Sequence, residues 1–258
     1  MEFKTMLRTA FSVLVAVAVM LSAANASPYA SSVVAFSQGV AADPGYDNPS
    51  VVLGSPPAVD SWSFPVSTTA APWEATEVVS LGDGGYITIA FDHPVMNNPA
   101  EVEYGTDLLV FGNSFFMTDW QGDGSIIGEY FEPAKIEVSQ DGVIFYEIAG
   151  TTADALYPYT ASAGDFVHAT PDGVSYMGRQ PGDVEADFLG GCGGAQVDIS
   201  DAIGAVGELD WIQFVRVTDV AGDSGIADVV GFADVVPEPA TVLIMLAGAA
   251  MLRRRKIR

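Results

Sequence analysis

Apolar and polar residues alternate with a period of two along much of the chain between residues 27 and 235. In the segment 85–91 every second residue is a large apolar one, and the residues of 92–94 end the run. Such alternation is typical of a strand with one buried face. The segment 107–111 is apolar on both faces, which indicates an inner strand. The pattern predicts a mostly β domain, because no segment shows helical spacing of comparable strength.

Turn residues divide the remaining alternating segments. The clearest hairpin joins 135–139 to 143–148, because Asp141 and Gly142 supply the positive φ that a tight turn needs. Two further strands and one short helical turn are predicted at 211–218, 227–235 and 199–206.

These segments give about eight strands, which predicts an all-β fold. Two loops, 43–77 and 149–194, greatly exceed the usual connection length, so they hold either extra short strands or a functional surface. A two-sheet, jelly-roll-like β-sandwich with long loops fits this layout better than a closed barrel or a repeat array.

The segment 1–26 is predicted to be an export signal. Lys4 and Arg8 precede an apolar run over 11–21, and a small-residue exit ends at Ala26. This order is typical of a secretory signal helix that is cleaved after Ala26, and the run is short for a bilayer span. A retained N-terminal anchor is the alternative. We expect the mature chain to begin near residue 27, outside the cytoplasm.

The last segment, 236–258, combines a Pro-Glu-Pro triplet, an apolar stretch over 242–252 and a basic end. The triplet is Pro237, Glu238 and Pro239, and the basic cluster is Arg253, Arg254, Arg255 and Lys256. An apolar helix of this kind stalls in the inner membrane, while the positive cluster holds its end on the cytoplasmic side. The prolines keep the junction extended and accessible.

This combination resembles the PEP-CTERM sorting signal of Gram-negative bacteria that make extracellular polysaccharide. The resemblance implies a processing partner, an exosortase, which is a membrane protease or transpeptidase that releases such proteins or transfers them to the cell surface or matrix. It also implies transient anchoring in the inner membrane. A plain C-terminal anchor is the alternative, but the stretch is shorter than the roughly 20 residues of a stable span.

The chain has a formal net charge of -23, from 10 Lys and Arg against 33 Asp and Glu. Seven of these bases lie in the two terminal segments, so the domain 27–235 contains only Lys135, Arg179 and Arg216. This balance argues against a nucleic-acid partner, because phosphate binding draws its affinity from Lys and Arg. Such a surface also repels itself unless cations screen it. With the single cysteine Cys192, the chain cannot form an internal disulfide.

Ordered, turn-centred sequence blocks cover much of the domain. They are 48–56, 79–87, 107–113, 132–142 and 214–219, followed by Gly231 and Phe232. These blocks resemble a group of uncharacterised bacterial surface proteins that are similar in layout to galactose-binding-like, discoidin-type sandwiches. The resemblance implies the sandwich fold and leaves the ligand open. Gly112 and Ala233 stand where that pattern has acidic residues, which weakens any transfer of a binding site.

A calcium site is the first candidate for chemistry. Calcium takes six to eight oxygens from carboxylates, amides and carbonyls, and an acidic secreted domain without disulfides offers both ligands and a need for neutralisation. Turn-rich strand ends supply the candidate ligands, which are Asp43, Asp47, Asn113, Glu132 and Asp219. The segment 119–129 imitates an EF-hand loop, but Gln121 and Tyr130 break the pattern. A solvated acidic face is the alternative for each carboxylate.

Carbohydrate binding is the second candidate. Trp62, Trp73 and Trp120 fall in expected loops, where flat rings stack on sugar faces and neighbouring Asp and Asn side chains bind hydroxyls. Binding to extracellular polysaccharide would follow. The alternative is that each ring anchors its loop to the sandwich.

Catalysis has weaker support from the sequence. His93 and His168 are the only histidines, no Gly-x-Ser-x-Gly motif is present, and Cys192 lies in a glycine-rich stretch. The sequence therefore predicts a non-enzymatic surface or matrix protein. A carbohydrate-active enzyme that uses paired carboxylates is the alternative function.

Overall fold

The computed structural model describes residues 27–60, 62–99, 101–153, 166–207, 209–222 and 225–235. A compact unit covers Pro28–Val236. The expected signal helix of 1–26 and the expected sorting segment of 236–258, with its triplet and basic cluster, lie outside the described residues. Within the described ranges, no helix is long and apolar enough to cross a membrane.

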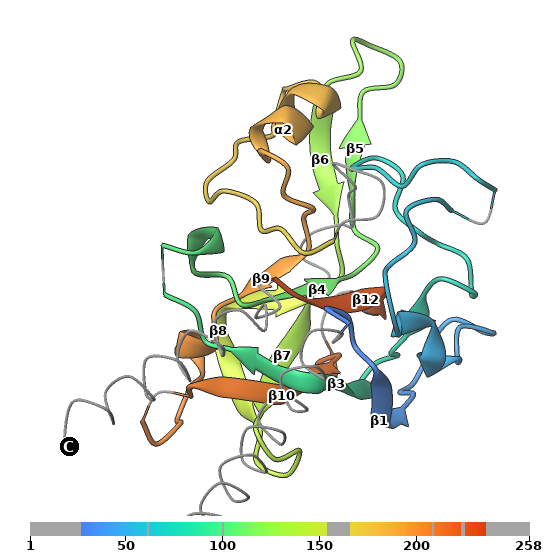
Figure 1. The fold of residues 1–258 in the computed structure, drawn as a ribbon. Helices are drawn as coiled ribbons and strands as arrows, with labels where there is room; N and C mark the ends of the chain where they lie inside the picture. The colour runs from blue at the N-terminus through green and yellow to red at the C-terminus, as the bar shows by residue number, and fades with distance from the viewer. Residues whose placement is uncertain are drawn as a thin grey trace, which may run out of the picture. The chain divides into compact units, whose positions relative to one another are not determined.

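The larger layer is a five-stranded antiparallel sheet with strand order β1-β3-β10-β7-β8 (Figure 1). Its members are β1 (Ser32–Ser37), β3 (Tyr86–Met96), β10 (Trp211–Thr218), β7 (Ala134–Ser139) and β8 (Tyr146–Ala153). Each neighbouring pair in this sheet runs antiparallel.

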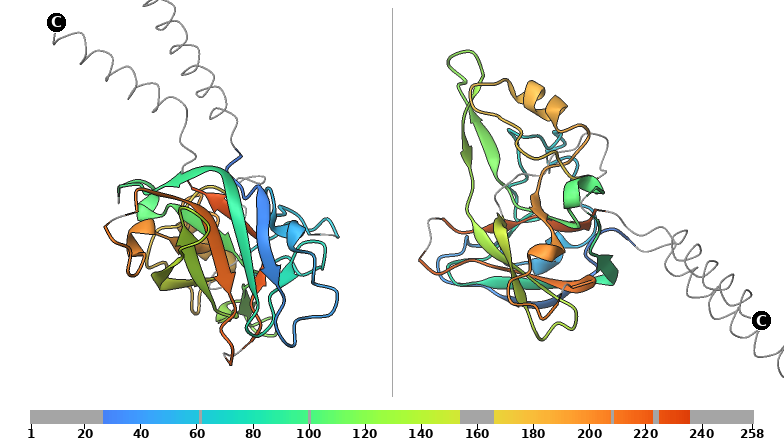
Figure 2. Two further views of the ribbon diagram at one scale, coloured as in Figure 1. Left: turned by 90° about the horizontal axis from the view of Figure 1, so that it is seen from below. Right: turned by 90° about the vertical axis from the view of Figure 1, so that its left-hand side faces the viewer.

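Shorter strands form the opposing layer (Figure 2). The strand order β12-β4-β9 makes a three-stranded sheet, and β11 pairs with β2 beside it. These strands are β12 (Gly231–Asp234), β4 (Leu108–Phe111), β9 (Ala195–Val197), β11 (Asp228–Val229) and β2 (Val79–Ser80). The mostly β character predicted from the sequence is confirmed, and the strand pairs of these sheets are antiparallel.

The main core lies between the two layers. Ile87 and Ile89 of β3 and Phe232 of β12 belong to one cluster of buried residues, and each is fully shielded from solvent. The period-two alternation places these β3 side chains on one face. Burial of each large apolar side chain contributes about 1.5–3 kcal/mol.

A second core covers the other face of β4. Leu108 and Val110 point into the main core, whereas Leu109 and Phe111 belong to a cluster with Phe166. The ring centroids of Phe111 and Phe166 lie 5.6 Å apart in an edge-to-face contact. The inner strand predicted at 107–111 is therefore confirmed as the middle strand of the smaller sheet.

A hairpin that the alternation analysis did not identify extends from the two layers. It consists of β5 (Phe115–Thr118) and β6 (Ile126–Tyr130), and the helix α2 (Pro181–Asp187) lies against it (Figure 1). Phe116 and Ile126 pack against Val184 and Phe188 in a third cluster. The described residues also form three 3₁₀ helices, η1 (Pro49–Val52), η2 (Glu103–Gly105) and η3 (Ile199–Asp201).

Two predicted strand boundaries differ from the structure. The residues 92–94 do not end β3, which continues to Met96, because its pairing with β10 shifts register between Ile212 and Phe214 and absorbs the irregular stretch. The segment 227–235 is divided into β11 and β12, which pair with different strands.

The turn at Asp141 and Gly142 is confirmed, but it is wider than a two-residue hairpin. Gly142 has a φ of +72°, and Asp141 Oδ1 accepts hydrogen bonds from the amides of Val143 and Ile144. Pairing resumes only at Val138 and Tyr146. The side chains of Val143 and Ile144 are exposed in the loop instead of lying in a strand.

The residues that precede β1 meet the last described strand, β12. Tyr29 forms an isolated bridge with Ala233, and the Asp234 amide donates to the Pro28 carbonyl at 2.7 Å. Beside this junction, the His93 ring lies between two carboxylates, with 2.7 Å from Nδ1 to Asp92 and 2.8 Å from Nε2 to Asp234.

Candidate functional site

Polar and aromatic residues from four parts of the chain enclose a cavity of about 480 Å³, which we name the acidic cleft. Its carboxylates come from the first long loop, from the residues after β6 and from β11, and its amide comes from the residues after β4. The lining consists of Asp43, Tyr46, Trp73, Asn113, Tyr130, Glu132, Gly225, Ile226 and Asp228.

Asp228 is the most deeply buried carboxylate of the acidic cleft. Its side chain is held by Asn113, whose Nδ2 donates to Asp228 Oδ2 at 3.0 Å, while Asp228 Oδ1 has no hydrogen-bond partner. Burial raises the pKa of Asp228 to about 7, against the lowering effect of hydrogen bonds with Ser80 and Asn113, and the charges of Glu132 and Asp43 act in the same direction as burial. Only 8% of the residue is exposed, so its charge lacks compensation from water.

Glu132 lies in the short segment between β6 and β7. Its Oε1 accepts hydrogen bonds from Tyr130 Oη at 3.0 Å and from the Ile226 amide at 3.1 Å. A Cβ on Gly225 would lie 2.7 Å from Glu132 Cγ, so only glycine fits between the two segments. These contacts fix one wall of the acidic cleft.

Asp219 does not line the acidic cleft, but it holds the loop that forms this wall. It is 3% exposed, and its Oδ2 accepts a hydrogen bond of 2.7 Å from the Ala227 amide. The bond closes the loop that leads into β11 and carries Gly225 and Ile226 into the acidic cleft. Asp219 is therefore a positioning group for the loop.

Asp43 and Tyr46 belong to one turn. The Tyr46 amide donates to the Asp43 carbonyl at 3.2 Å, and the Asp43 amide donates to Ser80 Oγ at 3.4 Å, which docks the turn on β2. Tyr46 Oη donates to the main-chain carbonyl of Trp73 at 2.7 Å. Burial, and then the charges of Glu74 and Asp43, raises the pKa of Tyr46, so the phenol remains a donor.

An aromatic wall borders these polar groups. The rings of Trp62 and Trp73 meet edge to face, with centroids 5.1 Å apart and planes at 89°. The two residues stay 62% and 47% exposed. Tyr130 stacks on Phe115 with centroids 5.3 Å apart. Flat ring surface thus lies beside the carboxylates.

The structure brings together some of the residues proposed from the sequence and separates others. Asp43, Asn113 and Glu132 line the acidic cleft. Asp47 is exposed and is not part of the lining, and Asp219 lies behind it.

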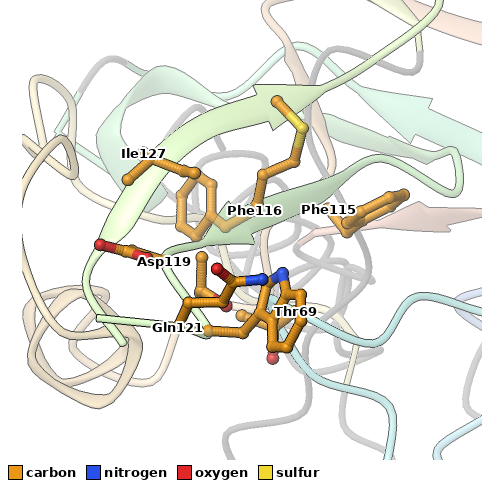
Figure 3. Close-up of a pocket in the computed structure, with 9 residues that line it drawn as sticks. Thr69, Phe115, Phe116, Asp119, Gln121 and Ile127 are labelled. Carbon is orange, nitrogen blue, oxygen red and sulfur yellow. The ribbon is translucent and has the colours of Figure 1, made fainter. Parts of the chain in front are cut away.

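The tryptophans also divide. Trp73 lines the acidic cleft, and Trp62 contacts Trp73. Trp120 belongs to a separate depression on the β5–β6 hairpin, which is lined by Phe115, Phe116, Ile127, Gln121 and Thr69 among others (Figure 3). Trp120 is 82% exposed there.

Asp228 was missed by the sequence analysis. It lies inside the apolar segment 227–235, which was interpreted only as a strand. The available signal was an acidic residue at a buried position of that strand, since such a residue requires a compensating partner.

Two carboxylates of the EF-hand-like segment accept hydrogen bonds from main-chain amides of the same segment. Asp119 Oδ1 accepts from the Gly122 amide at 2.9 Å, and Asp123 Oδ1 accepts from the Ser125 amide at 3.0 Å. Within the described ranges, no group of three or more His, Cys, Asp or Glu side chains could by itself hold a metal ion. A cation in the acidic cleft therefore needs amide or carbonyl oxygens, or water, beside the carboxylates.

The histidines and Cys192 occupy other positions. Cys192 is fully buried, and its Sγ lies 2.9 Å from the main-chain carbonyl of His168. The His168 ring instead faces Glu103, at 3.3 Å from Nδ1 to the carboxylate. The contact between Cys192 and His168 thus runs through the main chain and not through the imidazole.

Comparisons with known proteins do not assign this site. No protein-family model matches the chain, and no curated protein matches it.

Proposed function

We propose that the chain is an exported, non-enzymatic protein of the bacterial cell surface or extracellular matrix, and that its acidic cleft binds a calcium ion. The observation that carries the cation is the free Oδ1 of Asp228, a carboxylate oxygen that is buried in the cleft without a hydrogen-bond partner. A buried carboxylate without compensation costs free energy, and a bound cation removes that cost.

Calcium suits the donor set better than other metals. The oxygens near Asp228 come from the Asn113 amide and the Glu132 carboxylate, and the described part of the lining contains no histidine. Hard cations take such oxygens, and calcium accepts irregular geometry with water in the remaining positions. The described lining supplies three carboxylates, so water or carbonyl oxygens complete the coordination.

Export and sorting are proposed from the terminal segments. The signal at 1–26 and the Pro237-Glu238-Pro239 segment with its basic cluster support secretion, transient inner-membrane anchoring and processing by an exosortase-type partner. The two antiparallel layers are compatible with a jelly-roll-like surface domain of the galactose-binding-like type. Mass spectrometry of the C-terminal peptide from the native host tests the sorting, since processing should end the chain near Pro237.

Thermal unfolding of the full chain tests the calcium site. We expect calcium chloride to raise the melting midpoint relative to excess chelator, because a ligand that binds only the native state stabilises it. In Asp228→Asn this shift should disappear. In chelator at about pH 8 the variant should melt above the wild type, since it lacks the uncompensated charge.

Asp47→Asn is the matched control, because Asp47 lies in the same long loop but outside the cleft. It should keep the full calcium shift. An unchanged wild-type midpoint in calcium, or a full shift in Asp228→Asn, overturns the assignment.

A glycoside hydrolase is the second candidate, and one observation favours it. Asp228, whose pKa is about 7, shares the cleft with Glu132, and a carboxylic acid with a raised pKa beside a second carboxylate is the usual arrangement for general acid catalysis of glycoside cleavage. Release of reducing sugar from neutral polysaccharides, lost in Glu132→Gln and in Asp228→Asn, would establish this candidate. No release by the wild type removes it.

A further inference from the structure

We propose that the acidic cleft binds a neutral polysaccharide, with vicinal hydroxyls of one sugar on the bound cation and a sugar ring stacked on Trp73. This inference rests on the proposed cation site. The cavity of about 480 Å³ exceeds the space that one ion needs and falls within the range of small-molecule sites.

Trp73 is available as a stacking surface because another group already pins its loop. The Tyr46 hydroxyl holds the Trp73 carbonyl at 2.7 Å, so the segment does not depend on the indole for its position. The indole stays 47% exposed, and its neighbour Trp62 meets it edge to face at 5.1 Å. An edge-to-face contact fixes the ring while leaving ring surface exposed for a ligand.

The charge of the cleft selects a neutral ligand. Among the described residues, its lining contains the carboxylates of Asp43, Glu132 and Asp228 and no Lys, Arg or His. A divalent cation compensates only two of the three carboxylates, so a uronate or sulfate group would meet remaining negative charge. Sugar hydroxyls instead donate hydrogen bonds to carboxylates and offer lone pairs to the cation.

The cation and the ring lie on one continuous lining. Trp73 and Asp228 border the same cavity, together with Tyr46 and Tyr130, which present further ring surface and hydroxyl groups. A pyranose that lies on the Trp73 ring therefore directs its hydroxyl edge toward the carboxylates. Neither part alone provides both the apolar face and the oxygen ligands that a sugar ring requires.

Calorimetry with the full chain tests the inference in two steps. Calcium chloride is titrated first, alone, and three neutral polysaccharides (galactomannan, dextran and xyloglucan) are then titrated with calcium present. We expect at least one to bind, and binding should vanish in chelator. Polygalacturonate, an acidic polymer, should not bind.

Trp73→Ala should weaken polysaccharide binding roughly tenfold or more and leave the heat of calcium binding unchanged. Trp120→Ala is the matched control, because Trp120 is more exposed but lies in the depression on the hairpin. It should bind like the wild type.

The outcomes separate the inference from the function on which it rests. Calcium binding without binding of any neutral polysaccharide overturns the inference alone, as does unchanged affinity in Trp73→Ala. Preferential binding of polygalacturonate overturns the assignment to neutral ligands. Absence of calcium binding overturns the proposed function itself.

Discussion

His93 Nε2 lies 2.8 Å from Asp234 Oδ2, which joins β3 to the last described strand of the domain across 141 residues of sequence. Asp234 is almost fully buried, and Asp92 holds the other ring nitrogen at 2.7 Å. Burial by itself lowers the pKa of His93, but the hydrogen bonds and charges of the two carboxylates outweigh it, so the pKa is raised. The two carboxylates thus favour the charged imidazolium over the neutral ring.

This pair makes stability depend on pH. Because the native pKa of His93 is raised above its ordinary value of 6.5, its contribution to stability is fully present below about pH 6.5 and is lost as pH rises through the native pKa. Urea unfolding of the wild type from about pH 6 to pH 9 should show this loss. His93→Gln should lack it. Parallel profiles for the wild type and His93→Gln contradict the prediction.

Asp107 should also make the unfolding free energy depend on pH, but at lower pH than His93. Burial raises its pKa to about 6, although the amides of Ile199 and Asn98 donate to its two oxygens. When the pKa of a carboxyl is higher in the native state than in the unfolded state, the folded protein becomes less stable as pH increases between the two values. For Asp107 this interval runs from its ordinary pKa of 3.8 to about 6.

The predicted change in the unfolding free energy is about 3 kcal/mol, since one pKa unit corresponds to about 1.4 kcal/mol. Chemical unfolding of the wild type and Asp107→Asn measures it, because the common titrations cancel in their difference. The stability of the wild type relative to the variant should fall from about pH 4 to pH 7. A difference that stays constant or rises over this interval counts against the prediction.

Gly225→Ala should disturb the acidic cleft. Gly225 has a φ of +100°, and an added Cβ would lie 2.7 Å from Glu132 Cγ. We expect a loss of about 1–3 kcal/mol in the unfolding free energy and a smaller calcium-induced rise in melting midpoint. Gly222→Ala, at φ +89° with no atom within 4 Å of the new Cβ, has the same backbone strain without the contact. It should destabilise the protein but keep its calcium response, and equal responses in both variants contradict the role given to Glu132.

Phe232→Ala should cost about 3–5 kcal/mol of unfolding free energy, because it leaves a cavity between the two layers. Phe64→Ala, at a residue that is 62% exposed, should change the same quantity by less than about 0.5 kcal/mol. Denaturant midpoints at constant slope measure both. Similar midpoints for the two variants would show that Phe232 does not hold the layers together.

Local patterns fixed much of the larger sheet. The bounds predicted for 211–218 coincide with β10, because regular alternation continues over the whole strand and is sufficient to define it. The hairpin of β5 and β6 was missed because its strands are short, and its loop was compared with an EF-hand. Its stability comes from contacts with α2, about 60 residues later in the chain, which no local pattern reveals.

Part of the site was also predictable. Asn113 follows the predicted strand 107–111 and Glu132 precedes the predicted strand 135–139, so a place at strand ends was a reasonable expectation for both, and both line the acidic cleft. Asp43 and Asp47 could not be distinguished from the sequence, because their difference depends on the turn that docks on Ser80. Asp228 required knowledge of burial, since its place within a strand gives no sign of the cavity beside it.

The hydrogen bond between Asp234 and Pro28 has a consequence for engineering of the domain. Because the chain enters and leaves the fold at neighbouring points, a short linker could join these points and new ends could be opened in the exposed loop near Trp120. A circularly permuted chain of this kind should retain both layers, and the unaltered domain should be accepted as an insert within a surface loop of an unrelated host.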